Sequence, residues 1–286
     1  MRTSPAIVCA ILLLSSATMH GAQGPTFSSK LEAVRVDVLV TDRGQVLPGL
    51  RREDFEVRDN GVLQTVDLVS FQQIPLNVIL AFDVSASVSG ERLGHLQDAG
   101  RTLLEHLTKD DRSALLTFSH AVALRQGLTG DIARVREALR EVQPIGDTAL
   151  VDGSYSAMML DASDGGRSLL LVFSDGLDTA SWLTPERVLD AARRSDIVVY
   201  GVATRGLEDS KFLEDLGDLT GGAVVKIEST KNLSATFLRI LEEFRQRYLI
   251  SYSPAGVSKD GWHRLDVRIK GRRATVKSRA GYQAGN

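Results

Sequence analysis

Short, uninterrupted apolar runs alternate with amphipathic segments between residues 76 and 248. Val78–Phe82 and Leu169–Phe173 contain no polar residue, and Ile197–Val202 is nearly as apolar. Runs of this length are typical of strands buried on both faces. Residues 91–107 carry leucines at close to helical spacing, which predicts an amphipathic helix. Strands that alternate with helices predict an α/β fold with a doubly wound, mostly parallel sheet covered by helices on both sides.

Apolar spacing and end signals predict the remaining elements of this region. Thr184 followed by Pro185 marks a helix start, since threonine is a good cap and proline suits the first turn. The predicted helices are Glu91–Leu107, Ile132–Val142, Thr148–Leu160, the helix after Thr184, Lys211–Leu219 and Asn232–Arg247. The further strands are Ala114–Phe118, a short edge strand Val122–Leu124, and Val224–Ile227.

The two flanks of this region alternate apolar and polar residues, which predicts strands. In residues 27–73, Asp59-Asn60-Gly61 is a strong signal for a type I′ hairpin whose second strand continues through Val69. Residues 249–283 contain three predicted strands. Neither flank holds enough strands to be stable alone. We therefore predict one small all-β sandwich built from residues 27–73 and 249–283, with the domain 76–248 inserted between its halves.

Residues 1–22 have the pattern of a secretory signal peptide: one cation, Arg2, precedes the apolar core Ala6–Leu14. That core is too short to cross a bilayer, although a retained membrane anchor is the alternative. Cleavage removes Cys9, the single cysteine, so the mature chain has no disulfide. The sequence thus predicts a secreted or periplasmic protein without a stable membrane span.

Candidate chemistry is concentrated at the ends of predicted elements. Asp83, Ser85 and Ser87 follow the first buried strand, Thr148 opens a predicted helix, and Asp175 follows a second buried strand. Ligands of open α/β sheets bind at the carboxyl ends of the strands. Carboxylate and hydroxyl oxygens are ligands for hard divalent cations such as Mg²⁺, Ca²⁺ or Mn²⁺ rather than for zinc or copper.

These five residues, in this order and spacing, resemble the metal-ion-dependent adhesion site of the von Willebrand factor type A family. The spacing is 65 residues from Asp83 to Thr148 and 27 more to Asp175. The resemblance covers residues 76–248, and the β-rich flanks look like those of bacterial secreted proteins related to this family. It implies a von Willebrand A, Rossmann-like fold and a metal site made by Asp83, Ser85, Ser87, Thr148 and Asp175.

The resemblance also implies how the site acts. A divalent cation, with Mg²⁺ as the first expectation and Mn²⁺ or Ca²⁺ as alternatives, would accept an acidic side chain from a partner protein. Asp147 is interpreted as a helix cap or as a residue that contacts the metal ligands without binding the metal. Asp178 is interpreted as such a residue or as a solvated acid, and His95 and His106 as surface residues.

Other classes of function fit the sequence less well. The chain has 34 Lys and Arg against 36 Asp and Glu, a balance that argues against nucleic-acid binding. It contains no nucleophile-elbow, phosphate-loop or zinc-protease motif, so we expect no enzyme. The alternatives are a structural or assembly protein of the cell envelope with a non-essential metal site, and a metal-assisted hydrolase.

Overall fold

The computed structural model describes residues 33–71, 74–161, 166–204 and 211–285. The predicted signal segment 1–22, with Cys9, lies outside the described residues. No helix in the described ranges is long and apolar enough to cross a membrane.

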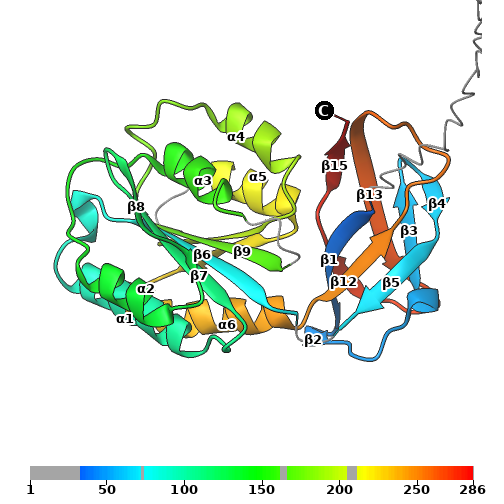
Figure 1. Cartoon of the computed structure of the whole chain (residues 1–286), viewed down its shortest axis with the longest axis horizontal. Helices are drawn as coiled ribbons and strands as arrows, with labels where there is room; N and C mark the ends of the chain where they lie inside the picture. The colour runs from blue at the N-terminus through cyan, green and yellow to red at the C-terminus, as the bar shows by residue number, and fades with distance from the viewer. Residues whose placement is uncertain (1–32, 72–73, 162–165, 205–210, 286) are drawn as a thin grey trace, which may run out of the picture. The chain divides into compact units, whose positions relative to one another are not determined.

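A six-stranded sheet lies between two layers of helices (Figure 1). Its strands, in order across the sheet, are β11 (Ala223–Ile227), β10 (Val198–Thr204), β9 (Arg167–Ser174), β6 (Leu76–Asp83), β7 (Arg112–Phe118) and β8 (Val122–Thr129). All neighbours pair in parallel except β8, which is antiparallel to β7. The mostly parallel sheet is therefore confirmed, although its edge strand β8 extends five residues beyond the predicted end at Leu124.

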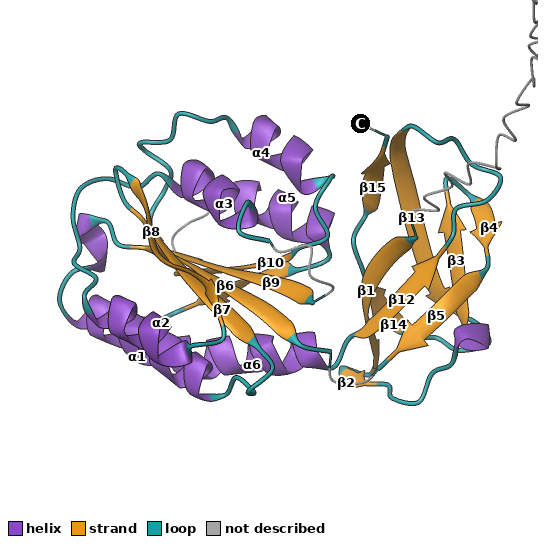
Figure 2. Ribbon diagram, viewed as in Figure 1, coloured by secondary structure: helices purple, strands orange, loops and turns teal. Residues whose placement is uncertain are grey.

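Three helices cover each face of this sheet (Figure 2). On one face are α1 (Glu91–Glu105), α2 (Ile132–Arg140) and α6 (Leu233–Arg245), and on the other α3 (Leu150–Met158), α4 (Pro185–Ala192) and α5 (Lys211–Thr220). Short 3₁₀ turns occur at η1 (Arg52–Asp54), η2 (Ala86–Val88) and η3 (Thr230–Asn232).

Strand β6 shows why the sequence forms a two-sided core. Every residue of β6 is buried, and its side chains alternate between the two helical layers. Val78, Leu80 and Phe82 belong to the cluster with α1, α2 and α6, whereas Ile79 and Ala81 belong to the cluster with α3, α4 and α5. A continuous apolar run is what such a strand requires, because neither face meets water.

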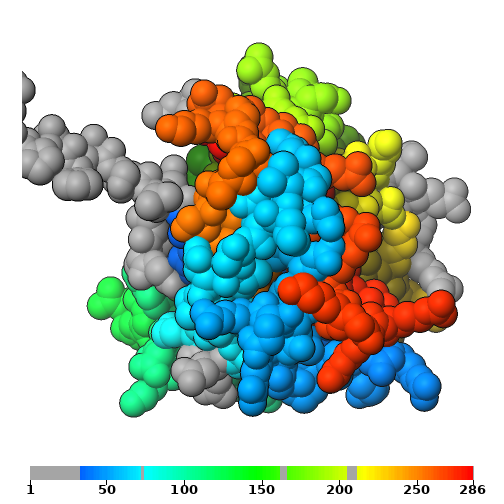
Figure 3. Space-filling view, turned by 90° about the vertical axis from the view of Figure 1, so that its right-hand side faces the viewer, coloured from blue at the N-terminus to red at the C-terminus, as the bar shows by residue number. Residues whose placement is uncertain are grey.

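The flanks form two further sheets in which N-terminal and C-terminal strands pair with each other. One contains, in order, β14 (Thr275–Lys277), β1 (Val34–Asp42), β12 (Tyr248–Tyr252) and β5 (Val66–Ser70), with β2 (Gln45–Val46) beside β1. The other contains β15 (Gly281–Ala284), β13 (Gly261–Ile269), β3 (Phe55–Asp59) and β4 (Val62–Gln64). Figure 3 looks onto these strands, where segments from the two ends of the chain lie side by side.

One apolar cluster draws on strands of both flanking sheets. Val38 of β1 and Ile250 of β12 share it with Val57 of β3 and Val267 of β13. The predicted hairpin is present: Asn60 and Gly61 both have positive φ, 47° and 85°, and Asp59 pairs with Val62. A type I′ turn needs this conformation at both central residues.

Two predictions for the flanks were wrong. The strand expected to continue through Val69 breaks after Gln64, because β4 pairs with β3 while β5 pairs with β12 in the other sheet. The buried Gln64 amide binds both backbone groups of Ala255 at this break. The C-terminal flank has four strands rather than three, since β15 follows β14.

Arginines link the helical region to the flanking strands. Arg167, the first residue of β9, pairs with Asp37 of β1 and donates to the carbonyl of Phe244, 3.0 Å away. Arg279 pairs with Asp196 at 2.6 Å. Only Gln246 and Arg247 separate α6 from β12, and Arg247 is fully buried with its guanidinium 2.6 Å from the hydroxyl of Tyr200. These contacts leave little slack between α6 and the flanking sheet.

Candidate metal site at the sheet edge

The predicted site residues lie at the carboxyl ends of two neighbouring strands. Asp83 ends β6, and Asp175 directly follows Ser174, the last residue of β9. The chain runs from β6 towards β7 on one side and returns to β9 on the other, so the strand order reverses between β6 and β9. A reversal of this kind opens a crevice at the carboxyl edge, where α/β sheets bind ligands.

Asp83 is fully buried and held through both of its oxygens. Oδ1 accepts the backbone N–H of Ser85 at 2.9 Å, and Oδ2 accepts the hydroxyl of Ser174 at 2.7 Å. Burial raises the pKa of the Asp83 carboxyl, and the negative charge of Asp175 acts in the same direction, whereas the hydrogen bonds from Ser85 and Ser174 act against them. The site therefore places two carboxylates where an added positive charge would be favourable.

The two predicted serines connect Asp83 to Asp175. The hydroxyls of Ser85 and Ser87 are 3.0 Å apart, and the Ser87 hydroxyl donates to Oδ1 of Asp175 at 2.7 Å. A continuous chain of polar atoms thus joins the loop after β6 to the loop after β9. The structure brings four of the predicted residues, Asp83, Ser85, Ser87 and Asp175, into one cluster.

Thr148 lies beside the same loop. A Cβ atom added to Gly176 would be 3.3 Å from the Thr148 hydroxyl, so that hydroxyl faces the residue after Asp175. The Thr148 carbonyl accepts the N–H groups of Thr179 and Ala180 at 2.8 and 3.0 Å. Thr148 is not the first residue of a helix as predicted: α3 begins at Leu150, because these loop bonds hold Thr148 outside the helix.

Two contacts of this cluster were missed in the sequence. Ser174 supports Asp83, and it stood in the sequence directly before a predicted ligand without a role of its own. Arg92 donates from Nη1 to Oδ2 of Asp175 at 2.7 Å. Its only sequence signal is a position at the start of the helix that follows the serines.

Asp178, His95 and His106, which were considered beside the site, have other partners, and Asp147 faces solvent. Asp178 accepts the N–H of Val151 at 3.2 Å and so supports the first turn of α3. Asp147 is exposed and is not the cap of α3, a position that Ala149 occupies. His95 bonds Thr230 at 2.9 Å and His106 bonds the carbonyl of Thr102 at 2.8 Å.

One histidine approaches the loop formed by residues 146–148, called the threonine loop below. A Cβ atom added to Gly146 would be 2.2 Å from Nδ1 of His120, which places the imidazole against this loop, two residues before Thr148. Among the residues that the structure describes, no group of three or more His, Cys, Asp or Glu side chains is arranged to hold a metal. The donor set at Asp83 and Asp175 is of another kind, with two carboxylates and several hydroxyls.

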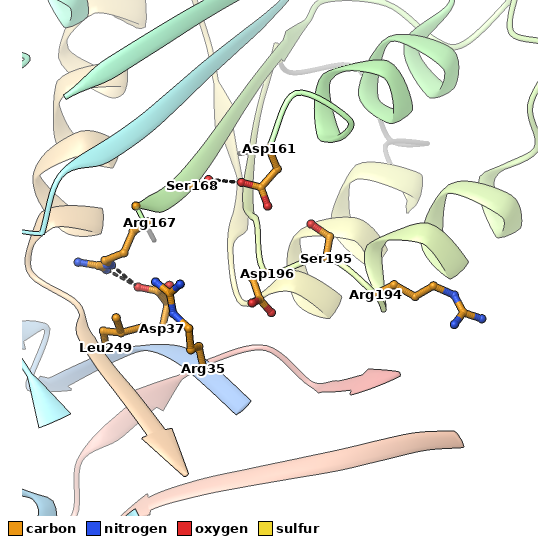
Figure 4. A pocket seen from close by; sticks show the side chains of 10 residues that line it. Arg35, Asp37, Asp161, Arg167, Ser168, Arg194, Ser195, Asp196 and Leu249 are labelled. Carbon is orange, nitrogen blue, oxygen red and sulfur yellow. Dashed lines mark hydrogen bonds and ion pairs between the residues drawn. The ribbon is translucent and has the colours of Figure 1, made fainter. Parts of the chain in front are cut away.

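A separate cavity of about 320 Å³ lies at the opposite, amino-terminal end of β9. Figure 4 shows Arg167 pointing to Asp37, and the hydroxyl of Ser168 directed at Asp161. Its charged lining comes from β1 (Arg35 and Asp37), from β9 (Arg167), and from the loops before β9 and β10 (Asp161, Arg194 and Asp196). Since the Arg167 charge is matched by Asp37 and by the Phe244 carbonyl, this ion pair serves the link to the flanking strands.

The fold and the site together define an open α/β sheet protein. Its oxygen donors lie at the carboxyl edge of the sheet, where the strand order reverses between β6 and β9. The model of the von Willebrand factor type A domain matches residues 77–239, more than half of the chain's 286 residues. The chain therefore belongs to the von Willebrand factor type A domain family, which confirms the family that the sequence resembles.

A known protein has a sequence related to that of this chain. The inter-alpha-trypsin inhibitor heavy chain H2 of Mus musculus is 25% identical over an alignment of 178 residues that covers 57% of this chain and 19% of that protein. The chain thus spans about a fifth of this curated relative.

Solved structures share the fold at low identity. A von Willebrand factor type A structure from Catenulispora acidiphila superposes with a TM-score of 0.56 at 14% identity. The superposition covers 80% of this chain and 72% of that chain. Proximal thread matrix protein 1 from the mussel byssus, solved with zinc in its metal-ion-dependent adhesion site (MIDAS) motif, superposes with a TM-score of 0.56 at 16% identity. That superposition covers 65% of this chain and 49% of the mussel chain.

Proposed function

We propose that Asp83, Ser85, Ser87, Thr148 and Asp175 hold one divalent cation. The observation that carries this proposal is the convergence of both carboxylates and both serine hydroxyls, with Ser87 bridging to Asp175 at 2.7 Å. The donors are hard oxygens, which suit Mg²⁺ first and Mn²⁺ or Ca²⁺ as alternatives. The zinc in the mussel protein adds Zn²⁺ to the ions that a titration should include.

The chemistry of the donors supports a role in binding rather than in structure alone. Two carboxylates only balance the charge of a divalent ion, so the ion stays electrophilic and can accept a further acidic ligand. We infer that this ligand is an acidic side chain of a partner protein and that the chain is a non-enzymatic, adhesion-type binding module. The signal-like pattern of residues 1–22 supports a secreted or periplasmic location for this module.

The flanking strands support a second part of the proposal. Strand pairing between β1 and β12 and between β3 and β13, with one apolar cluster across both sheets, favours a single β-sandwich. Residues 27–73 and 249–283 would be its halves, with the von Willebrand A domain 76–248 inserted between them. Tyr248 is the first residue of β12, which supports a junction at this residue.

Affinity capture from an envelope extract tests the binding function. The full chain should retain a partner when Mg²⁺ is present and release it on chelation, and Asp83→Ala should retain none. The matched control is Asp98→Ala, an exposed acid of α1 that lies away from the cluster and pairs with Arg101. A partner held equally with and without chelator would favour a structural protein of the envelope instead.

A metal-assisted hydrolase is the remaining alternative, and the position of His120 against the threonine loop is the observation that favours testing it. Turnover of a phosphoester or peptide library that Asp83→Ala and His120→Ala both abolish would replace the adhesion proposal. We expect no such turnover.

A further inference from the structure

Asp175 already has a cationic partner within the chain. Its Oδ2 accepts from Nη1 of Arg92 at 2.7 Å, while its Oδ1 accepts from Ser87. The same Nη1 lies 3.3 Å from the Ser87 carbonyl, so the guanidinium bridges the two loops that carry the proposed ligands. Both oxygens of Asp175 are therefore engaged by side chains of the protein itself.

The two partners of this ion pair differ sharply in exposure. The Asp175 side chain is 0% exposed, whereas that of Arg92 is 54% exposed. A buried carboxylate needs a counter-charge or hydrogen-bond donors, because an unpaired buried charge is costly. The half-exposed arginine can instead rotate into water at little cost in solvation. Breaking the ion pair would therefore cost free energy mainly at Asp175, which stays buried, and little at Arg92, which water can solvate.

We propose that Arg92 determines the occupancy of the metal site by competing with the divalent cation for Asp175. This inference rests on the proposed function, since it presumes that Asp175 serves the cation. Two like charges at one carboxylate repel, so binding of the cation requires the Arg92 guanidinium to leave Oδ2 or to share it at a cost. Arg92 therefore lowers the affinity for the cation and stabilises the metal-free protein.

Titration calorimetry with Mg²⁺ on the full chain and on Arg92→Gln tests the competition. Removing the guanidinium should tighten the dissociation constant about tenfold, which corresponds to about 1.4 kcal/mol. Arg101→Gln is the matched control, because Arg101 lies on the same helix, is similarly exposed, and pairs with Asp98 and Glu105 away from the site. Its affinity should equal that of the wild type.

Thermal unfolding supplies a second readout. In chelator, Arg92→Gln should unfold at a lower temperature than the wild type because Asp175 loses its counter-charge. With saturating Mg²⁺ its gain in unfolding temperature should exceed that of the wild type. Should Arg92→Gln fail to fold, Arg92→Lys keeps the charge on a shorter, more mobile donor and should tighten binding by a smaller factor.

Three outcomes would overturn the inference. Unchanged or weaker Mg²⁺ affinity in Arg92→Gln, with normal binding by the wild type, would mean that arginine and cation do not compete. An equal gain in Arg101→Gln would assign the effect to overall charge. Absence of binding in the wild type and in every variant would contradict the metal site itself, and the inference would fall with it.

Discussion

At the scale of single residues, the site combines a destabilising carboxylate with the donors that hold it. Asp83 is fully buried, and burial raises the pKa of its carboxyl. The folded chain thus holds this proton more tightly than the unfolded chain does. Stability of the metal-free protein is then lost as the pH rises from the ordinary range of an aspartate through the raised pKa of Asp83.

Asp83→Asn should therefore stabilise the metal-free protein at neutral pH, by about 1 kcal/mol. The amide keeps the size of the side chain, and the Ser174 hydroxyl has another acceptor in the carbonyl of Gly176, 3.1 Å away. Denaturant unfolding in chelator as a function of pH measures the effect. The advantage of the variant should vanish in acid, where Asp83 is protonated. A variant less stable than the wild type at neutral pH would show that the charge serves the fold.

The sequence predicted the positions of the candidate ligands but not the contacts around them. Asp83 and Asp175 were identifiable because each ends or follows an apolar run at a strand end. Arg92 and Ser174 were not, since their roles depend on partners 83 and 91 residues away. The start of α3 was misplaced for a related reason: Thr179 and Ala180, distant in sequence, bind the Thr148 carbonyl and exclude it from the helix.

At the scale of elements, the joint between α6 and β12 decides whether the helix can move. In some members of the family the last helix of the domain slides when a partner's acid arrives, and α6 is the corresponding helix here. Here Arg247 is fully buried at the joint and bound to the Tyr200 hydroxyl, and Arg167 ties the start of β9 to β1. These contacts favour a rigid joint over one that couples partner binding to the flanking sheets.

A flexible Gly/Ser linker inserted between Arg247 and Tyr248 tests this rigidity. With a rigid joint, the folded linker variant keeps both its metal affinity and its partner affinity, measured by calorimetry and by titration with the captured partner. Its unfolding temperature falls because the inserted residues loosen the connection between α6 and β12. Altered partner affinity at unchanged metal affinity would instead show that α6 and the flanking sheets are coupled.

At the scale of the whole molecule, the flanks depend on each other. Strand order in both flanking sheets mixes the two ends of the chain, so neither end can complete a sheet alone. The alternating pattern predicted strands in each flank, yet it did not show that β4 and β5 join different sheets. That assignment depends on the pairing of β4 with β3 and of β5 with β12, which the local alternation of apolar and polar residues does not specify.

Residues 27–73 and 249–283 should each be unfolded when expressed separately, because each piece leaves strand edges and apolar faces without partners. Tethering the two pieces should restore β structure, visible as dispersed amide signals in a ¹⁵N NMR spectrum. A dispersed spectrum from residues 27–73 alone would contradict the single sandwich.

The proposed site holds one divalent cation through Asp83, Ser85, Ser87, Thr148 and Asp175. Titration calorimetry with Mg²⁺, Mn²⁺, Ca²⁺ and Zn²⁺ on the full chain and on Asp83→Ala tests it most directly, with circular dichroism to verify that the variant is folded. We expect one site in the wild type and none in Asp83→Ala. Binding by folded Asp83→Ala with wild-type affinity would contradict it.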